Sequence, residues 1–308
     1  MRAVRLAAMI AAALGLTSAG GGCTPLPADR SAPPSGAPGP EGGWVYQLQG
    51  YPGGRLDELA QAPQRLAVID LARDAGTDYF RPEEIAALRA TGKTVLAYFE
   101  IGAIEEFRPE YAQLRAEAPD LILNRWPDWP DEHFVRYWHP HWWERVVKPR
   151  VDRALRAGFD GVYLDTPLAY EELDLALVPG WNRTQLARQM VDLIVAISRY
   201  AKASAAGFQI VPQNSPELRN YPGYTQAIDG IGMEELFVRA TDNPCGDGYC
   251  AENLEHTRAL LDAGKYVLAV DYATDAGLVA MACAHYRTEH FAGYVGVRAL
   301  DRISVACR

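Results

Sequence analysis

Acidic and amide side chains stand at the ends of several short apolar runs in this 308-residue chain, as in GVYLD and GIGME. The set comprises Asp70, Glu100, Asp165, Asn214, Glu234 and Asp271. Carboxylates gathered around one pocket repel one another, so they persist chiefly where they do chemistry, bind a metal or hold a polar or cationic ligand. Any one of them alone could be a surface acid or a loop cap, but their recurrence favours a site.

Two of these acids, Asp165 and Glu234, are our candidates for catalysis. Hydrolysis of a glycosidic bond uses two carboxyl groups, one protonating the leaving oxygen and the other attacking the anomeric carbon or activating water. We assign Asp165 as nucleophile and Glu234 as general acid/base, and the reverse assignment is the alternative. A separation of about 5 to 6 Å between the two carboxyl groups would indicate retention, and one near 9 Å inversion.

Tryptophan supports a sugar site, since six of the seven lie between residues 126 and 181. Sugar rings stack on aromatic rings, while carboxylates and amides bind their hydroxyl groups. We expect Trp138 and one of Trp126 and Trp129 at the cleft, and Trp142 and Trp143 in the core. The other expected substrate-binding residues are Asp70, Tyr98, Glu100, Tyr163, Asn214 and Asp271, with Tyr46 a weaker candidate like Asp70.

A repeated unit of helix, glycine and strand must position these residues. Its four copies carry Gly92, Gly158, Gly207 and Gly264. Glycine after the last helical turn adopts the left-handed conformation that ends a helix, and the continuous apolar run after it fits a parallel strand buried on both faces. Helices therefore alternate with parallel strands.

Counting the strands predicts the architecture. The other strand candidates are residues 44–48, 66–71, 134–138, 228–234 and 294–298, giving nine in all, with helices expected over 82–91 and 184–206. About 265 residues are the length of one (β/α)8 barrel, with one strand surplus and with the active site at the carboxyl ends of the strands. The alternative is a doubly wound open sheet, which we disfavour because no Gly-rich phosphate loop follows the first strand.

The segment before residue 44 is expected to lie outside the fold. Arg2 and Arg5 precede an apolar run too short to span a membrane, so residues 1–22 are typical of a signal peptide. Small residues then precede Cys23, which favours a lipoprotein; Gly20, where Leu is usual, leaves simple cleavage as the alternative. Residues 23–43 are rich in proline and predict a flexible linker, so the folded domain is 44–308.

Four further cysteines remain, an even number that suggests disulfides in an exported chain. We expect Cys245 to pair with Cys250 and Cys283 with Cys307, and buried free thiols are the alternative. The spacing of the cysteines does not match a zinc site.

The formal charge of −9 argues against a nucleic-acid partner, which needs a basic surface. A metal-dependent hydrolase is a further alternative, but the acids lie on separate strands and His133, His139 and His141 lack ligand spacing. We expect those histidines in a polar loop and at a helix start, and no cofactor.

Six strings in order resemble glycoside hydrolase family 114, the endo-α-1,4-polygalactosaminidase type: WVYQLQGYP, VLAYFEIG with EEFR, WPDE with VRYWHP, GFDGVYLDT, IVPQNSPEL and IDGIGMEELF. The resemblance implies a (β/α)8 barrel that cleaves α-1,4-linked galactosamine polymers, partly N-acetylated, with Asp165 and Glu234 as catalytic acids. Where the family usually has Ser-Ile-Gly-Glu, this chain has Glu100 and, at the last position, Ala103.

The resulting prediction is an exported glycosidase, either a lipoprotein of a bacterial cell envelope or secreted, acting as a monomer on a galactosamine-rich polysaccharide. Its only expected link to a membrane is a lipid on Cys23. Glu100 and Ala103 keep open an alternative, a tethered carbohydrate-binding barrel that has lost turnover.

Overall fold

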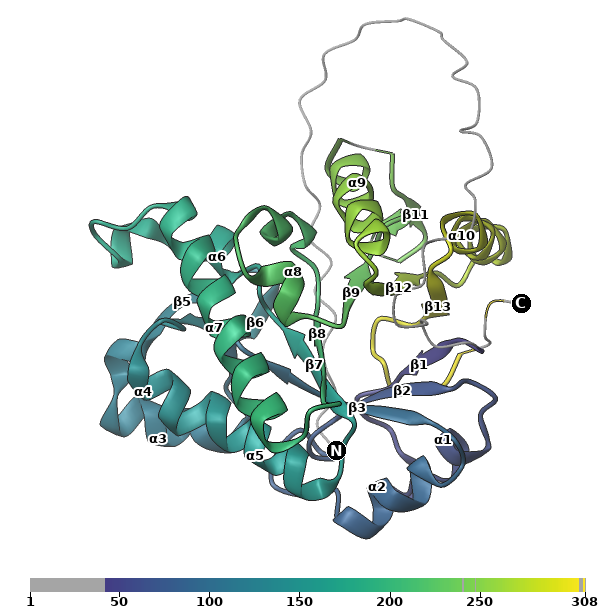
Figure 1. The fold of residues 1–308 in the computed structure, drawn as a ribbon, viewed down its shortest axis with the longest axis horizontal. Coiled ribbons are helices and arrows are strands. Elements are labelled where there is room, and N and C mark those ends of the chain that lie inside the picture. Colours follow the sequence, from purple (N-terminus) through teal and green to yellow (C-terminus); the bar gives the residue numbers. More distant parts are fainter. Residues whose placement is uncertain (1–41, 240, 247, 305–306, 308) are drawn as a thin grey trace, which may run out of the picture. The chain divides into compact units, whose positions relative to one another are not determined.

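The computed structural model describes residues 42–239, 241–246, 248–304 and 307 (Figure 1). The expected signal peptide, Cys23 and the linker up to residue 41 lie outside the described residues. No helix in the part described is both long and apolar enough to cross a membrane.

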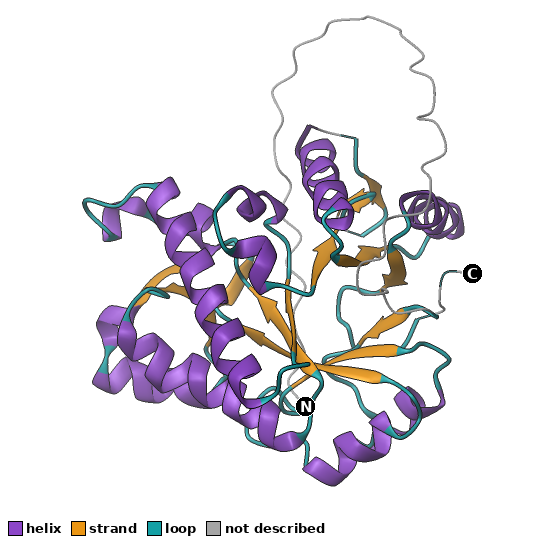
Figure 2. Ribbon diagram, viewed as in Figure 1, coloured by secondary structure: helices purple, strands orange, loops and turns teal. Residues whose placement is uncertain are grey.

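The described segments alternate between strands and helices (Figure 2). The strands are β1 Trp44–Tyr46, β2 Leu66–Asp70, β3 Thr94–Glu100, β4 Ala103–Glu105, β5 Ile122–Trp126, β6 Trp129–Val135, β7 Gly161–Asp165, β8 Gln209–Pro212, β9 Gly230–Glu234, β10 Val238–Arg239, β11 Asn243–Pro244, β12 Tyr266–Tyr272 and β13 Ala292–Gly296. The α-helices are α1 Asp57–Gln61, α2 Pro82–Arg89, α3 Pro109–Glu117, α4 Pro140–Trp142, α5 Lys148–Ala157, α6 Ala169–Glu172, α7 Arg183–Ser204, α8 Tyr224–Ala227, α9 Gly248–Asp262 and α10 Ala276–Glu289.

Two parallel sheets carry the strand ends that interest us. One has the order β1-β2-β3-β7-β8 and the other β13-β12-β9, and every pair in both is parallel. A parallel bridge joins Gln213 after β8 to Gly232 of β9. At the other edge, the Trp44 indole N–H donates to the Ala292 carbonyl over 2.9 Å. Helices connect consecutive strands of these sheets, so the fold is α/β.

One strand prediction is wrong. The structure places no parallel strand over 134–138; instead β6 ends at Val135 and pairs antiparallel with β4 and β5, in a small sheet inserted between β3 and α4. An apolar run does not reveal whether its partner is parallel or antiparallel, which explains the error. Asp165 and Glu234 therefore end the fourth and sixth parallel strands, where the sequence count made them the fifth and seventh.

The helix ends follow the glycine rule in three of its four copies. Gly92, Gly158 and Gly264 have φ between 81° and 86°, and Gly158 closes α5. Gly207 is not among the residues with positive φ, and α7 ends three residues before it.

Aromatic rings fill the face of the sheets on which the catalytic candidates stand. Ring centroids of Tyr46 and Tyr163 lie 5.3 Å apart, and those of Trp44 and Tyr163 6.2 Å. Side chains two positions apart on a strand share a face, so Tyr163 and Asp165 project to the same side of β7. The rings thus form an apolar layer next to the acids.

Two acids at strand starts have structural roles. Asp160 accepts from the backbone N–H of Val95 over 2.9 Å, and Asp229 accepts from that of Ile210 over 2.8 Å. Each ties the start of its own strand to the neighbouring one.

Candidate active site

Asp165 ends β7 and is half-buried. The Tyr98 hydroxyl donates to its Oδ2 over 2.5 Å and the Thr166 backbone N–H to its Oδ1 over 2.6 Å. Burial raises the pKa of Asp165 to about 6, although these two hydrogen bonds favour the charged form. The carboxyl is thus held in a fixed position and titrates near neutral pH.

Glu234 ends β9 and is also half-buried. Its Oε2 accepts from the side-chain amides of Gln213 and, over 3.2 Å, Asn214, while its Oε1 accepts from the Tyr272 hydroxyl. Burial, followed by the negative charge of Asp165, raises the pKa of Glu234 to about 7. The charge of Asp165 therefore reaches Glu234, and the two acids share one electrostatic environment.

Asn214, one of the expected substrate-binding residues, lies beside Glu234. Its Oδ1 also accepts from the Glu234 backbone N–H over 2.9 Å, so Asn214 binds both the side chain and the backbone of Glu234. Asn214 and Ser215 both have positive φ, 60° and 51°, and Pro216 follows. The backbone after β8 thereby turns sharply and keeps the amide at the carboxylate.

Tyrosines form the floor between the two acids. The Tyr46 hydroxyl donates to Gln213 Oε1 over 3.1 Å, which orients the amide that binds Glu234. The Tyr163 hydroxyl is buried without a hydrogen-bond partner in the described structure. It lies against Gly232, where an added Cβ would collide with it, so glycine is required two residues before Glu234.

Asp70 and Glu100 lie at strand ends too, but each is only 1% exposed. Arg108 Nη2 lies 2.9 Å from Asp70 Oδ2 and 3.1 Å from Glu100 Oε2, and Arg150 Nη2 lies 3.3 Å from Glu100 Oε1. Burial would raise the pKa of Glu100, but the charges of Arg108 and Arg150 outweigh it and lower the pKa. For Asp70 burial outweighs Arg108, and its pKa is raised. These two acids are enclosed in a buried ion-pair cluster rather than presented to a ligand.

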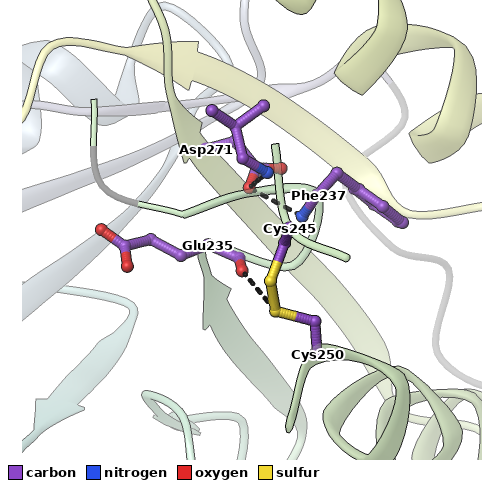
Figure 3. The surroundings of a disulfide bond; sticks show 6 residues. Glu235, Phe237, Cys245, Cys250 and Asp271 are labelled. Carbon is purple, nitrogen blue, oxygen red and sulfur yellow. Dashed lines mark hydrogen bonds between the residues drawn. A yellow bond between two sulfur atoms is a disulfide. The ribbon is translucent and has the colours of Figure 1, made fainter. Parts of the chain in front are cut away.

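Asp271 is the clearest departure from the expected site. It is 0% exposed, and it accepts from the backbone N–H group of Phe237 over 2.9 Å (Figure 3). It also accepts from the backbone N–H group of Val238 over 2.8 Å and from the Tyr286 hydroxyl over 2.5 Å. Tyr272, the next residue, is the one that reaches Glu234. Because neighbouring side chains on a strand point to opposite faces, Asp271 faces away from the acids and fixes the loop after β9.

Both expected disulfides are present. Cys245 and Cys250 have their Cα atoms 6.3 Å apart, and the Cys250 sulfur lies 3.7 Å from the carbonyl of Glu235, the residue after Glu234 (Figure 3). Cys283 of α10 and Cys307 near the end of the chain have Cα atoms 5.2 Å apart. Disulfides are typical of exported proteins.

The tryptophans divide between core and surface. Trp138 lies in a turn after β6, half-buried, with its ring 5.0 Å from that of Trp181. Trp126 packs on Phe134, whereas Trp129 is 41% exposed. Trp129 is thus the better placed of the two for stacking a sugar. Trp142 and Trp143 begin a helical segment; Trp142 is fully buried in the core as expected, whereas Trp143 is only partly buried against it.

The histidine prediction holds for the helix start, where His139 and His141 lie, but His133 is a buried residue of strand β6 and not part of a loop. His133 lies 3.2 Å from the Tyr111 hydroxyl and 2.9 Å from Glu106, and His139 caps α4. In the described part of the chain, no group of three or more His, Cys, Asp or Glu side chains could hold a metal ion.

Four residues near the acids were not identified from the sequence: Gln213, Tyr272, Glu105 and Glu132. Gln213 and Tyr272 each stand one position from a residue that we did choose, so alternation along the strand would have found them. Glu105 and Glu132 lie in the strings EEFR and WPDE, but the inserted sheet that brings them near Asp165 was not predicted.

Comparison with known proteins decides the family. The model of glycoside hydrolase family GH114 matches residues 26–308. The chain belongs to family GH114. This GH114 protein is therefore a glycosidase, and a polysaccharide is its class of substrate.

Three relatives illustrate the match. An uncharacterized protein of Deinococcus radiodurans is 35% identical over 261 residues, covering 84% of this chain and 82% of the relative. The crystal structure of Aspergillus fumigatus Ega3 in complex with galactosamine has a TM-score of 0.67 at 17% identity, over 89% of this chain and 99% of Ega3. The glycoside hydrolase domain of PelA from Pseudomonas aeruginosa has a TM-score of 0.66 at 18% identity, over 87% and 99%. At such identities the structures show a shared fold.

Proposed function

We propose that this GH114 glycosidase is an endo-acting enzyme that cleaves α-1,4-linked galactosamine or N-acetylgalactosamine polysaccharide, with retention and through Asp165 and Glu234. The observation that carries the proposal is the pair of half-buried carboxyl groups at the ends of β7 and β9, with pKa values raised to about 6 and about 7. Between these values one acid can be ionised while the other keeps its proton.

In the first step the ionised Asp165 attacks the anomeric carbon, the glycosidic bond breaks, and Glu234 gives its proton to the leaving oxygen. In the second step Glu234 takes a proton from water, the resulting hydroxide attacks the anomeric carbon, and the bond to Asp165 breaks. The product keeps its anomeric configuration and Asp165 is again ionised. Hydrogen bonds from Tyr98 and Asn214 hold the two acids for these transfers.

The substrate assignment rests on the family resemblance and on the likeness to Ega3, whose crystal structure contains galactosamine. We further propose that the two parallel sheets close as a (β/α)8 barrel; the bridge at Gln213 and the Trp44 to Ala292 hydrogen bond at the other edge support this. Trp129, exposed on the inserted sheet, would stack a sugar ring of the polymer.

The test is reducing-end release from defined α-1,4-galactosamine oligomers, free and N-acetylated, with the anomer of the first product read by NMR. We expect internal cleavage, the retained anomer, and no product from Glu234→Gln. Asp131→Asn, an exposed acid on the inserted sheet, is the control. An inverted product would refute the nucleophilic role of Asp165. Binding of the oligomers without turnover by the native protein would favour the tethered binding protein instead.

We also propose that residues 1–22 are a signal peptide, that Cys23 carries a lipid, that residues 23–43 tether the domain 44–308, and that the enzyme is a monomer of the cell envelope. Both disulfides support export. The mass of the mature N-terminal peptide tests the anchor: a peptide starting at an unmodified residue other than Cys23 would exclude it.

A further inference from the structure

The inserted sheet places two glutamates directly opposite each other. Glu105 of β4 is the register partner of Glu132 of β6, so both side chains project to the same face of that sheet. Like charges in such a cross-strand pair are destabilising. The negative charge of Asp165 acts on both glutamates, so this face of the inserted sheet borders the catalytic acid.

Glu132 lacks the partners that a buried carboxyl normally has. It is 8% exposed, and no hydrogen bond or ion pair reaches its carboxyl from the part of the chain that the structure describes. Glu105 has one cationic partner, Arg108, whose Nε lies 2.7 Å from its Oε2. Buried carboxylates are normally paired, so an unpaired one beside a second acid indicates a missing cation.

Glu106, directly after β4, projects to the opposite face of the inserted sheet and has close partners for its carboxylate. Glu106 lies 2.9 Å from His133 Nε2 and 2.7 Å from Arg125 Nη2. The hydrogen bond from His133, with the nearby charge of Arg125, lowers the pKa of Glu106. The chain therefore supplies close partners to Glu106, whereas Glu132 receives only the charge of Arg108, without a hydrogen bond or ion pair from the described residues.

We propose that Glu105 and Glu132 form a subsite beside Asp165 that binds the ammonium group of an amino sugar unit of the substrate. This inference rests on the proposed function and deepens it, since it distinguishes free galactosamine from its N-acetylated form. An ammonium group carries three donors and one positive charge, which can satisfy both carboxylates at once. An acetamide carries no charge and cannot compensate the ionised carboxylates.

Burial and the neighbouring acids raise the pKa of Glu105 to about 8 and that of Glu132 well above its ordinary value. Burial and the neighbouring acids outweigh the charge of Arg108 at both residues, so each carboxyl tends to hold a proton in the free enzyme. A ligand ammonium group would take the place of that proton.

The experiment compares kcat/KM for an α-1,4-galactosamine oligomer with that for the same oligomer after full N-acetylation. For Glu132→Gln we expect a loss of about 10- to 100-fold on the free amine, because a charge-assisted hydrogen bond is removed, and a change of less than about 3-fold on the acetylated oligomer. Asp131→Asn, the same charge change at the preceding exposed residue, should alter neither. Glu105→Gln is the second variant, with circular dichroism as the check that each folds.

Equal losses on both oligomers, or no loss on the free amine in folded variants, would overturn the subsite. If the native enzyme cleaves neither oligomer, the proposed function fails, and the subsite is then judged by calorimetric binding of galactosamine against N-acetylgalactosamine to the native protein and to Glu132→Gln. Preference for galactosamine that disappears in Glu132→Gln supports the subsite without any turnover. Equal binding of both sugars contradicts it.

Discussion

Glu100 and Glu234 both end parallel strands, and both are removed from water to a large extent, yet their surroundings act in opposite directions. Around Glu100, Arg108 and Arg150 supply positive charge and its pKa is lowered. Around Glu234 the partners are two amides and a tyrosine, the negative charge of Asp165 has the largest charge effect, and the pKa rises to about 7. Glu100 and Glu234 therefore share a position at a strand end, and the charges of the surrounding side chains decide whether each carboxyl stabilises the fold or can transfer a proton.

The two regions have different roles: the cluster around Arg108 stabilises the fold, and the acids at the ends of β7 and β9 are available for proton transfer. The arginine-neutralised cluster joins β2 and β3 to the segment after β4 and to α5, and it encloses its acids beside arginine side chains. The acids at β7 and β9 remain able to take or release a proton near neutral pH. Variants in the first region should change stability, and variants in the second should change activity.

The largest expected effect is on turnover. Asp165→Asn should lower kcat by about 10³-fold or more, because the amide cannot form the covalent intermediate. The measurement is reducing-end release, with circular dichroism as the check of folding. Glu100→Gln is the matched variant: it removes a carboxylate at a strand end too, and its folded fraction should keep kcat within about 10-fold. Full activity in Asp165→Asn would contradict the different roles that we assign to Asp165 and Glu100.

Next in size is the loss of the shared arginine. Arg108→Met leaves Asp70 and Glu100 buried without their main cation, so the free energy of unfolding at pH 7 should fall by about 3 to 5 kcal/mol. Urea denaturation measures it. Arg125→Met, which breaks the exposed ion pair with Glu106, should cost less than about 1 kcal/mol. The loss in Arg108→Met should shrink as the pH falls toward 4, because protonation removes the uncompensated charges; a loss independent of pH would argue against this account.

A smaller and opposite effect on stability is expected at Asp165. The folded pKa of Asp165, about 6, lies above that of an unfolded aspartate, so ionisation of this group destabilises the fold as the pH rises from about 4 to 6. Asp165→Asn removes that cost and should raise the free energy of unfolding by about 3 kcal/mol at pH 8, and by nothing at pH 4. Asp160→Asn, at the other end of the strand, should destabilise at pH 8. A lower free energy of unfolding in Asp165→Asn at pH 8 would show that the ionised Asp165 does not destabilise the fold.

The smallest effect is expected from removing the Tyr98 hydroxyl group, which donates a hydrogen bond to Asp165. Its hydrogen bond from Tyr98 favours the ionised carboxylate, so Tyr98→Phe should raise the pKa of Asp165 further. The acid limb of the kcat/KM profile should move upward by about 0.5 to 1 pH unit, with the plateau little changed. By the same argument Tyr272→Phe should move the alkaline limb upward through Glu234. If Tyr98→Phe moved only the alkaline limb, Asp165 would be the proton donor.

Much of the fold was readable from local patterns. Apolar runs after helix-ending glycines located β3, β7 and β12, and the acids at strand ends included both catalytic candidates. The antiparallel pairing of β6 could not be read, because a strand's partner depends on residues far along the chain. For the same reason the sequence did not reveal that Glu105 faces Glu132.

The sequence by itself determined the family, the alternation of helix and strand, and the presence of Asp165 and Glu234 at strand ends, because these depend on residue type and on short-range order. Only the tertiary structure decided which strand-end acids are exposed to a ligand. Asp271 points to the opposite face and binds its own loop, and Glu100 is neutralised by arginines 8 and 50 residues away along the chain. Burial and long-range charge pairing arise only when distant segments pack together, and they set whether a carboxyl group holds the fold or performs chemistry.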